Sequence, residues 1–183
     1  MASRTIIGID PGTNLLGFGV VDVLDGKPKF VDMGVLDIRK EKDPYQKLRQ
    51  IFDTVSEVIK TYYGTEMALE SPFYGKNAQV ILKLGRAQGA AMIAAMEQGL
   101  SVTEYAPRAA KQAITGNGAA SKEQVSNMLE KTLDMTVKAE HLDATDALAI
   151  AMCHYYTTSN PLAALKGKSS WEKYIKDHPE KVK

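Results

Sequence analysis

Four acidic residues stand at positions in the chain where carboxylates are unusual. Asp10 ends the apolar run IIGID directly before Pro-Gly, and Glu70 ends the run MALE directly before Ser-Pro. Asp143 and Asp146 lie three residues apart in the alanine-rich stretch HLDATDALAIAMCHYY, and on a helix they would share one face. Like charges at this spacing repel each other, so the pattern predicts a cation that holds the carboxylates.

Clustered carboxylates are the ligands that hard divalent cations such as Mg²⁺ prefer. In an open α/β sheet, ligands bind at the carboxyl ends of strands, so acids at two strand ends and one helix start could converge there. Two such ions, about 4 Å apart, can hold the attacking and the leaving oxygen of a phosphodiester. The residue types therefore predict metal-dependent hydrolysis of a phosphodiester.

Each acid also has a simpler interpretation. An Asp before Pro-Gly commonly forms a turn, and Glu70 could face solvent at the end of its strand. Asp143 and Asp146 could favour the dipole of a helix N-terminus, although this explains Asp143 better than Asp146. The joint placement of the acids, and no single residue, favours a shared site.

The segments around these acids predict an α/β fold. Three strand-like runs, with an Asp-Gly turn between the last two, indicate a meander, and helical and strand-like segments alternate after it. The expected strands cover residues 4–10, 15–23, 29–38, 66–70 and 101–106. The expected helices cover residues 44–63, 77–98, 107–115, 121–133 and 141–156. This order predicts a five-stranded mixed sheet flanked by helices in one domain, residues 1–165, before a polar, lysine-rich, loosely ordered tail, residues 166–183.

Composition excludes several classes of protein. With 44% hydrophobic and 25% charged residues, the 183-residue chain is typical of a globular domain, and no apolar run reaches the roughly 18 residues of a membrane helix. The N-terminus lacks the features of a signal peptide, and the single cysteine cannot form an internal disulfide, so we expect a cytoplasmic protein. Because the net charge is only +1, any DNA-binding surface must come from the distribution of charge.

Four segments together resemble the RuvC family of Holliday junction resolvases: IIGIDPGTNLLGFGVVD, ALESPFYGKNAQVILKLGRAQGA, EYAPRAAKQAITGNGAASKEQV and HLDATDALAIAMCH. The resemblance implies a ribonuclease H-like fold and nicking of two strands of a four-way DNA junction, leaving a 5′-phosphate and a 3′-hydroxyl. It implies Mg²⁺ as the cofactor, two ions per subunit, with Mn²⁺ as a substitute. The catalytic, metal-binding acids of the family fall on Asp10, Glu70, Asp143 and Asp146. Some relatives have a histidine as the third acid, and His141 does not match that position.

The resemblance also implies DNA-binding residues. Phe73, in the loop SPFYGKN, matches an aromatic that stacks on an unpaired base at the junction centre; without the resemblance, packing on its own domain would be expected. Lys111 and Lys122 match basic positions beside the acids, where a cation would hold the scissile phosphate or offset charge in the transition state. The candidates for contacts with backbone phosphates are Lys76, Lys83, Arg86 and Arg108.

Two partners follow from the same resemblance, a second copy of the chain and a branch-migration helicase complex. Gly85 and Gly89 lie among alanines in the expected helix 77–98, and small residues on one face let another backbone come close. Packing on the chain's own sheet is the alternative. The resemblance favours this helix as the seam of a homodimer, which a bulky charged residue at Gly89 or Ala91 should weaken.

Three other functions fit parts of the sequence. An actin-like or sugar-kinase-like ATPase also begins with a strand, an Asp and a Gly-Thr turn, but it normally needs two such domains and lacks the paired acids of LDATD. The loop around Phe73 and the matching lysines disfavour a ribonuclease H-like nuclease that acts on RNA or simple duplexes. A non-catalytic junction-binding protein would not need four intact acids.

Overall fold

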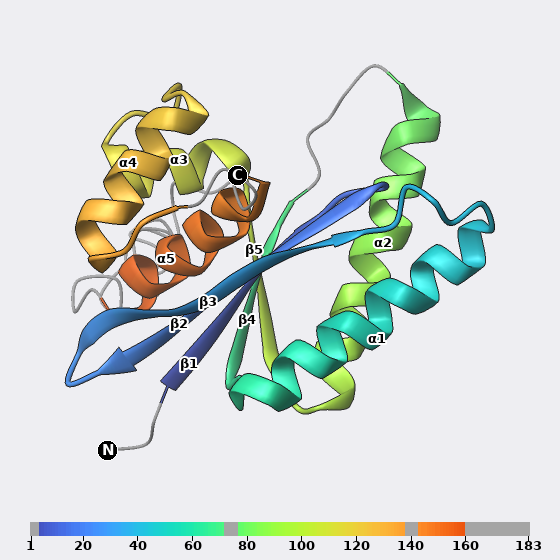
Figure 1. Cartoon of the computed structure of the whole chain (residues 1–183), viewed down its shortest axis with the longest axis horizontal. Coiled ribbons are helices and arrows are strands. Elements are labelled where there is room, and N and C mark those ends of the chain that lie inside the picture. The colour runs from blue at the N-terminus through green and yellow to red at the C-terminus, as the bar shows by residue number, and fades with distance from the viewer. Residues whose placement is uncertain (1–3, 72–76, 138–142, 160–183) are drawn as a thin grey trace, which may run out of the picture.

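The computed structural model describes residues 4–71, 77–137 and 143–159 (Figure 1). Its strands are β1 (Arg4–Pro11), β2 (Leu15–Leu24), β3 (Lys27–Asp37), β4 (Glu66–Glu70) and β5 (Ser101–Tyr105). They form one sheet in the order β3-β2-β1-β4-β5, with antiparallel pairing from β3 to β1 and parallel pairing from β1 to β5. The predicted five-stranded mixed sheet is confirmed. The predicted tail over residues 166–183 lies outside the described residues.

The hairpin between β2 and β3 follows from its turn residues. Asp25 and Gly26 both have positive φ angles, 51° and 77°, which the common two-residue hairpin turn requires. Glycine adopts this region freely, and aspartate tolerates it better than most residues. The Asp-Gly pair therefore sets the register of the meander, as the sequence predicts.

The helices of the described residues are α1 (Pro44–Tyr62), α2 (Ala78–Glu97), α3 (Pro107–Thr115), α4 (Lys122–Leu133) and α5 (Thr145–Ser159). The Asp43 side chain caps α1 by accepting a hydrogen bond from the backbone N–H of Tyr45, and Ser121 with Gln124 forms a capping box on α4. Both starts agree with the sequence. In the part of the chain that the structure describes, no helix is long and apolar enough to cross a membrane.

The start of the last helix differs from the prediction. Residues 141 and 142 lie outside the described residues, and Asp143 belongs to a short 3₁₀ turn ahead of α5. Asp146 lies in the first turn of α5 itself. The two acids therefore lie across the junction between a 3₁₀ turn and α5, and not within one continuous α-helix.

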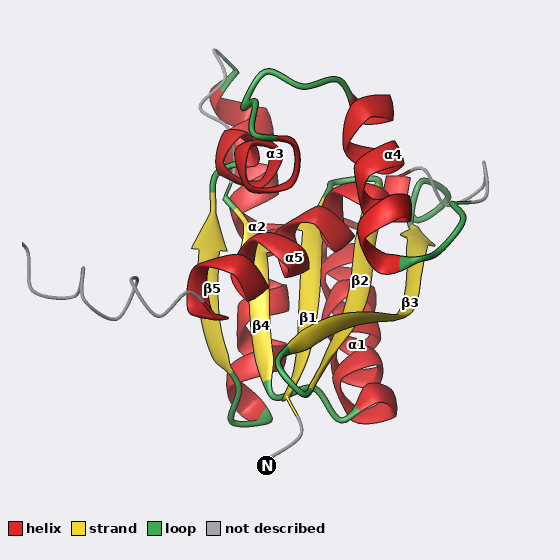
Figure 2. Cartoon of the chain, turned by 90° about the vertical axis from the view of Figure 1, so that its left-hand side faces the viewer, coloured by secondary structure: helices red, strands yellow, loops and turns green. Residues whose placement is uncertain are grey.

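The sheet lies between two layers of helices. α1 and α2 cover one face, and α5 covers the other with α3 and α4 packed outside it (Figures 1 and 2). Alternate residues of β1 separate the two cores, because Ile6 packs with α5 whereas Ile7 and Ile9 pack with α1 and α2. From Thr145 to His154, every residue of α5 except Asp146 is buried. An alanine-rich helix with no polar face suits this position between sheet and helices.

Glycines in β1 and β2 let α5 lie directly on the sheet. A Cβ atom on Gly8 would come within 2.1 Å of the carbonyl oxygen of Ala147, and one on Gly19 within 2.6 Å of Cα of Leu148. A Cβ atom on Gly17 would lie 2.9 Å from the carbonyl oxygen of Asp143. These glycines therefore set the height of α5, and with it the position of its acidic N-terminus, above the sheet.

The change Gly8→Ala should lower the free energy of unfolding by about 1–3 kcal/mol, because the backbone of α5 must move away from the added methyl group. Urea unfolding measures the change. Gly85→Ala is the matched control: a Cβ there meets nothing within 4 Å, and alanine should stabilise the helix by about 0.5–1 kcal/mol. Equal effects of the two substitutions would contradict the close packing of α5 on β1.

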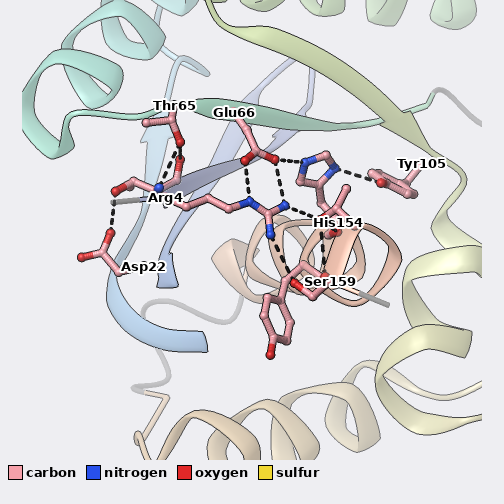
Figure 3. Close-up of polar contacts among 10 residues, drawn as sticks. Arg4, Asp22, Thr65, Glu66, Tyr105, His154 and Ser159 are labelled. Carbon is pink, nitrogen blue, oxygen red and sulfur yellow. Dashed lines mark hydrogen bonds and ion pairs between the residues drawn. The ribbon is translucent and has the colours of Figure 1, made fainter. Parts of the chain in front are cut away.

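A polar network fixes the other end of α5 to the start of the sheet (Figure 3). Arg4 Nη2 donates to Glu66 Oε2 at 2.9 Å, and the same oxygen lies 2.6 Å from His154 Nε2. His154 Nδ1 lies 2.9 Å from the hydroxyl of Tyr105. Hydrogen bonds from Arg4, and also from His154, hold the pKa of the Glu66 carboxyl below its usual range despite partial burial. His154 is thus a buried structural residue.

Candidate active site

Asp10 and Glu70 lie side by side at one edge of the sheet. β1 and β4 are parallel with Ile9 aligned to Leu69, so the next residue of each strand carries a carboxylate at the same level. Both acids alternate with residues that pack against α5, namely Gly8 and Ala68. The two carboxylates therefore share the face of the sheet that α5 covers.

The entry to α5 brings the other two acids to this edge. Gly17 is the cross-strand partner of Asp10, and the backbone of Asp143 lies directly over it. Lys122, the first residue of α4, places Nζ 3.0 Å from Asp143 Oδ1 and 3.1 Å from Asp146 Oδ2. One lysine thus bridges the pair of carboxylates at the start of α5.

The pKa values of the acids report their mutual proximity. Burial, and then the charges of Asp146 and Asp143, raise the pKa of Asp10 to about 6, against the opposing charge of Lys122. Burial, and then the charges of Asp10 and Asp146, raise the pKa of Glu70 to about 8. The neighbouring carboxylates therefore make Asp10 and Glu70 harder to ionise, which is the situation that a bound cation relieves.

Both lysines predicted beside the acids lie in the same electrostatic cluster. The charges of Lys111 and Lys122 lower the pKa of Glu70 and so oppose the effect of burial. Burial disfavours the charged form of Lys122, but its contacts with Asp143 and Asp146 outweigh that cost and raise its pKa. The Lys122 ammonium therefore stays charged beside the carboxylates.

The remaining candidates do not all join this cluster. Arg86 is exposed on α2, which covers the opposite face of the sheet. Arg108 is exposed at the start of α3, and its side chain packs against Gly118 in the turn before α4. Phe73 and Lys76 lie outside the described residues, so their DNA-binding roles stay predictions.

The sequence interpretation missed Arg39. It follows β3, which ends at the same edge as β1, and its guanidinium is paired with Asp37 at 2.6 Å. The contact with Asp37 raises the pKa of Arg39, and the charge of Asp143 raises it further. A basic residue just past a strand that ends at the same edge as β1 was the available signal, but an exposed arginine at a strand end does not by itself indicate a site.

The donor set fits a hard divalent cation. All four acidic side chains offer carboxylate oxygens, which Mg²⁺ and Mn²⁺ prefer over the softer ligands of other metals. Among the described residues, no three acidic, histidine or cysteine side chains form a ready-made metal cage. Lys122 instead provides the positive charge between Asp143 and Asp146. A metal ion would therefore bind in exchange for part of this contact.

Comparisons with solved structures confirm the ribonuclease H-like architecture. The structure of Thermus thermophilus RuvC matches with a TM-score of 0.75 and 32% identity, over 85% of this chain and 95% of that chain. T. thermophilus RuvC in complex with Holliday junction substrate matches with a TM-score of 0.73 and 31% identity, over 85% of this chain and 94% of that chain.

Comparisons of sequence agree with this result. The family model described as crossover junction endodeoxyribonuclease RuvC matches residues 6–154. RuvC of Bacteroides fragilis is 48% identical over 98% of this chain and 96% of its own length. RuvC of Christiangramia forsetii is 46% identical over 100% of this chain and 94% of its own length. The chain therefore belongs to the RuvC family of crossover junction endodeoxyribonucleases.

Proposed function

We propose that this chain resolves Holliday junctions in DNA recombination and repair by paired, Mg²⁺-dependent hydrolysis of phosphodiesters. The observation that carries the proposal is the convergence of Asp10, Glu70, Asp143 and Asp146 at one edge of the sheet, with Lys122 bridging two of them. Family membership supports the same activity, and the T. thermophilus relative was solved in complex with Holliday junction substrate.

The acids and the lysines have different roles in the proposed reaction. The four carboxylates would hold two Mg²⁺ ions, with Mn²⁺ as a substitute, and when bound these ions polarise the phosphoryl oxygen and activate water. Lys111 and Lys122 carry positive charge at the rim of the cluster, where the scissile phosphate must lie. Their charge would stabilise the additional negative charge of the transition state. The products would be a 5′-phosphate and a 3′-hydroxyl.

Incubation of the protein and Mg²⁺ with three labelled substrates tests the proposal. The substrates are a synthetic four-way junction, a linear duplex of the same sequence and an RNA–DNA hybrid. We expect symmetric nicks in the junction and intact duplex and hybrid strands. Equal cleavage of the duplex would remove the junction selectivity, and preferred cleavage of the hybrid would favour a ribonuclease.

We further propose that the active form is a homodimer that uses α2. A four-way junction has near two-fold symmetry, and a C2 dimer would present one acidic cluster to each of two strands. The sequence left the face of α2 open, and Ala91 is now excluded from the seam because it is fully buried within the chain's own core. The outer face carries Gly85, Gly89, Ile93 and Met96; the last two are 60% and 66% exposed.

Ile93→Glu should weaken dimerisation at least tenfold, because it places a charge in the centre of an apolar seam. Sedimentation velocity across a concentration series measures the dissociation constant. Met128→Glu is the control, since Met128 is also an exposed apolar residue but lies on α4. On a cruciform plasmid the Ile93 variant should make single nicks, which give relaxed circles, in place of the paired nicks that give linear DNA. A wild type that stays monomeric on the junction would contradict the dimer.

A branch-migration helicase complex and a cytoplasmic location complete the proposal. Both rest on the family resemblance and on the composition of the chain, and no contact surface for the helicase is assigned. Co-purification of the helicase with this protein on junction DNA, but not on duplex DNA, is the expected result.

A further inference from the structure

A cavity of about 560 Å³ lies on the face of the sheet that α1 and α2 cover, at the edge where β1 and β3 end. Its walls come from the turn between β1 and β2, the segment after β3, and the first halves of α1 and α2. Thr13 and Asn14 of that turn follow Asp10 by only three and four residues. Its volume is within the roughly 300–1,000 Å³ of typical small-ligand sites.

The lining of the cavity combines an apolar floor with a basic rim. Ile38, Ile51 and Ala87 are buried and form part of the floor. Tyr45 stands at the edge with 73% of its surface exposed. The charged lining residues are Arg39, Lys42, Lys47, Lys83 and Arg86, against a single acid, Glu41. The Glu41 carboxylate accepts hydrogen bonds from two backbone N–H groups, and the five basic residues outnumber this one acid at the rim.

Two of the five basic side chains hold the wall, and the other three are available to a ligand. Lys47 Nζ donates to the carbonyl oxygen of Thr13 at 3.3 Å and to Asn14 Oδ1 at 3.1 Å. Arg39 is paired with Asp37. Within the described residues, no hydrogen bond or ion pair engages the side chains of Lys42, Lys83 or Arg86.

A backbone hydrogen bond braces the edge of the sheet between the cavity and the acidic cluster. The backbone N–H of Ile38 donates to the carbonyl oxygen of Asn14 at 2.9 Å, which joins the end of β3 to the turn after β1. Arg39 follows directly in the chain, and the charge of Asp143 contributes to its raised pKa. A strand whose phosphate reaches the acids would therefore cross this edge of the sheet to enter the cavity.

We infer that the cavity binds one unpaired nucleotide of the DNA strand that passes through the active site, with its base on Tyr45 and the apolar floor and its phosphates on Lys42 and Lys83. An apolar floor under a basic rim matches a nucleotide, which has a flat base and an anionic phosphate. A base within a duplex has both faces covered by its neighbours, so only an unpaired nucleotide offers the base and the phosphate together. The inference rests on the proposed function, because the occupant belongs to the junction substrate.

Substitutions at Tyr45 test the base contact. Tyr45→Ala should weaken binding to the junction about tenfold in EDTA, where nothing is cut, since stacking of a base on an aromatic ring is lost. Tyr45→Phe retains the ring and should bind as the wild type does. Neither change should alter binding to a linear duplex. A loss with Phe equal to that with Ala, or a loss of the same size on the duplex, would overturn the inference.

Substitutions of the free lysines test the phosphate contacts. The double change Lys42→Ala and Lys83→Ala should reduce the slope of log K against log salt for the junction by about two, because two phosphate contacts are removed. Lys60→Ala is the matched control, an exposed lysine at the far end of α1, and should leave the slope unchanged. An unchanged slope in the double variant would overturn the phosphate assignment.

Crosslinking separates this inference from the function on which it rests. With 4-thiothymidine placed at successive positions around the cut, one position should crosslink to peptides containing Tyr45 or Lys83. Crosslinks confined to α3 and α4, in a protein that still binds and cuts the junction, would overturn the nucleotide site alone. Failure of the wild type to bind or cut a four-way junction would overturn the proposed function as well. Tight binding of free dAMP that does not compete with the junction would overturn the nucleotide site in favour of a small-molecule site.

Discussion

Replacing Glu70 with Gln, or Asp146 with Asn, is expected to reduce junction cleavage by about a thousandfold or more and to leave junction binding within a few-fold of the wild type. Metal ions contribute several kcal/mol to such reactions, and each 1.4 kcal/mol changes a rate about tenfold. The two acids lie in one cluster, where the charge of Asp146 raises the pKa of Glu70, so both should be ligands of the ions. Affinity for the junction should come instead from lysine and arginine contacts to phosphates, and salt should weaken it.

A gel-shift assay beside a cleavage assay separates the two effects. Asp53→Asn is the matched control, because Asp53 is an exposed carboxylate that pairs with Arg49 at 2.8 Å on α1, away from the sheet edge. Exposed helix pairs contribute about 0.3–0.5 kcal/mol, so this control should cut at the wild-type rate. Cleavage by the Glu70 or Asp146 variant at close to the wild-type rate would show that the acids are not the active site.

Much of this site could be predicted because strand ends are visible in the sequence. Asp10 and Glu70 each follow an apolar run and precede a turn signal, and the parallel pairing of β1 with β4 then places them together. The position of Asp143 beside the other acids was harder to predict. It depends on a 3₁₀ turn and on how closely Gly17 lets α5 approach the sheet. Helical spacing correctly suggested that Asp143 and Asp146 share one side, where Lys122 contacts both, but it did not predict the 3₁₀ turn at Asp143.

The proposed dimer seam shows why composition alone cannot assign the faces of α2. α2 has small residues on both of its faces, and alanine and glycine fit equally well against a sheet or against another helix. In the structure Ala87, Ala91 and Ala95 pack inward, whereas Gly85 and Gly89 face outward. Only the position of the helix on the sheet separates these faces. Similarly, the placement of Arg86 at a cavity on the other face depends on tertiary packing, which no motif records.

The clustered acids proposed to bind metal should destabilise the protein in the absence of metal. Burial and the charges of Asp10 and Asp146 raise the pKa of Glu70 from 4.5 to about 8 in the folded protein. Between these two pH values the folded protein keeps a proton that the unfolded chain gives up, so the free energy of unfolding falls as pH rises. A tenfold change in an ionisation equilibrium corresponds to about 1.4 kcal/mol, so the loss by pH 8 should amount to several kcal/mol.

Glu70→Gln, although inactive, should therefore raise the melting temperature of the metal-free protein at pH 8 by several degrees and have little effect at pH 4.5. The glutamine side chain does not ionise, so at pH 8 it avoids the cost of a buried negative charge among carboxylates. At pH 4.5 the wild-type carboxyl is largely protonated in the folded protein, so the two proteins should differ little. Added Mg²⁺ should neutralise the carboxylates and raise the melting temperature of the wild type at pH 8 more than that of the variant. Calorimetry in EDTA and in Mg²⁺ at both pH values measures these differences, with Glu57→Gln, an exposed glutamate of α1, as the control. A Glu70 variant less stable than the wild type at pH 8 in EDTA would mean that the ionised carboxylate is already compensated by Lys111 and Lys122, and that the site does not need a cation to hold it.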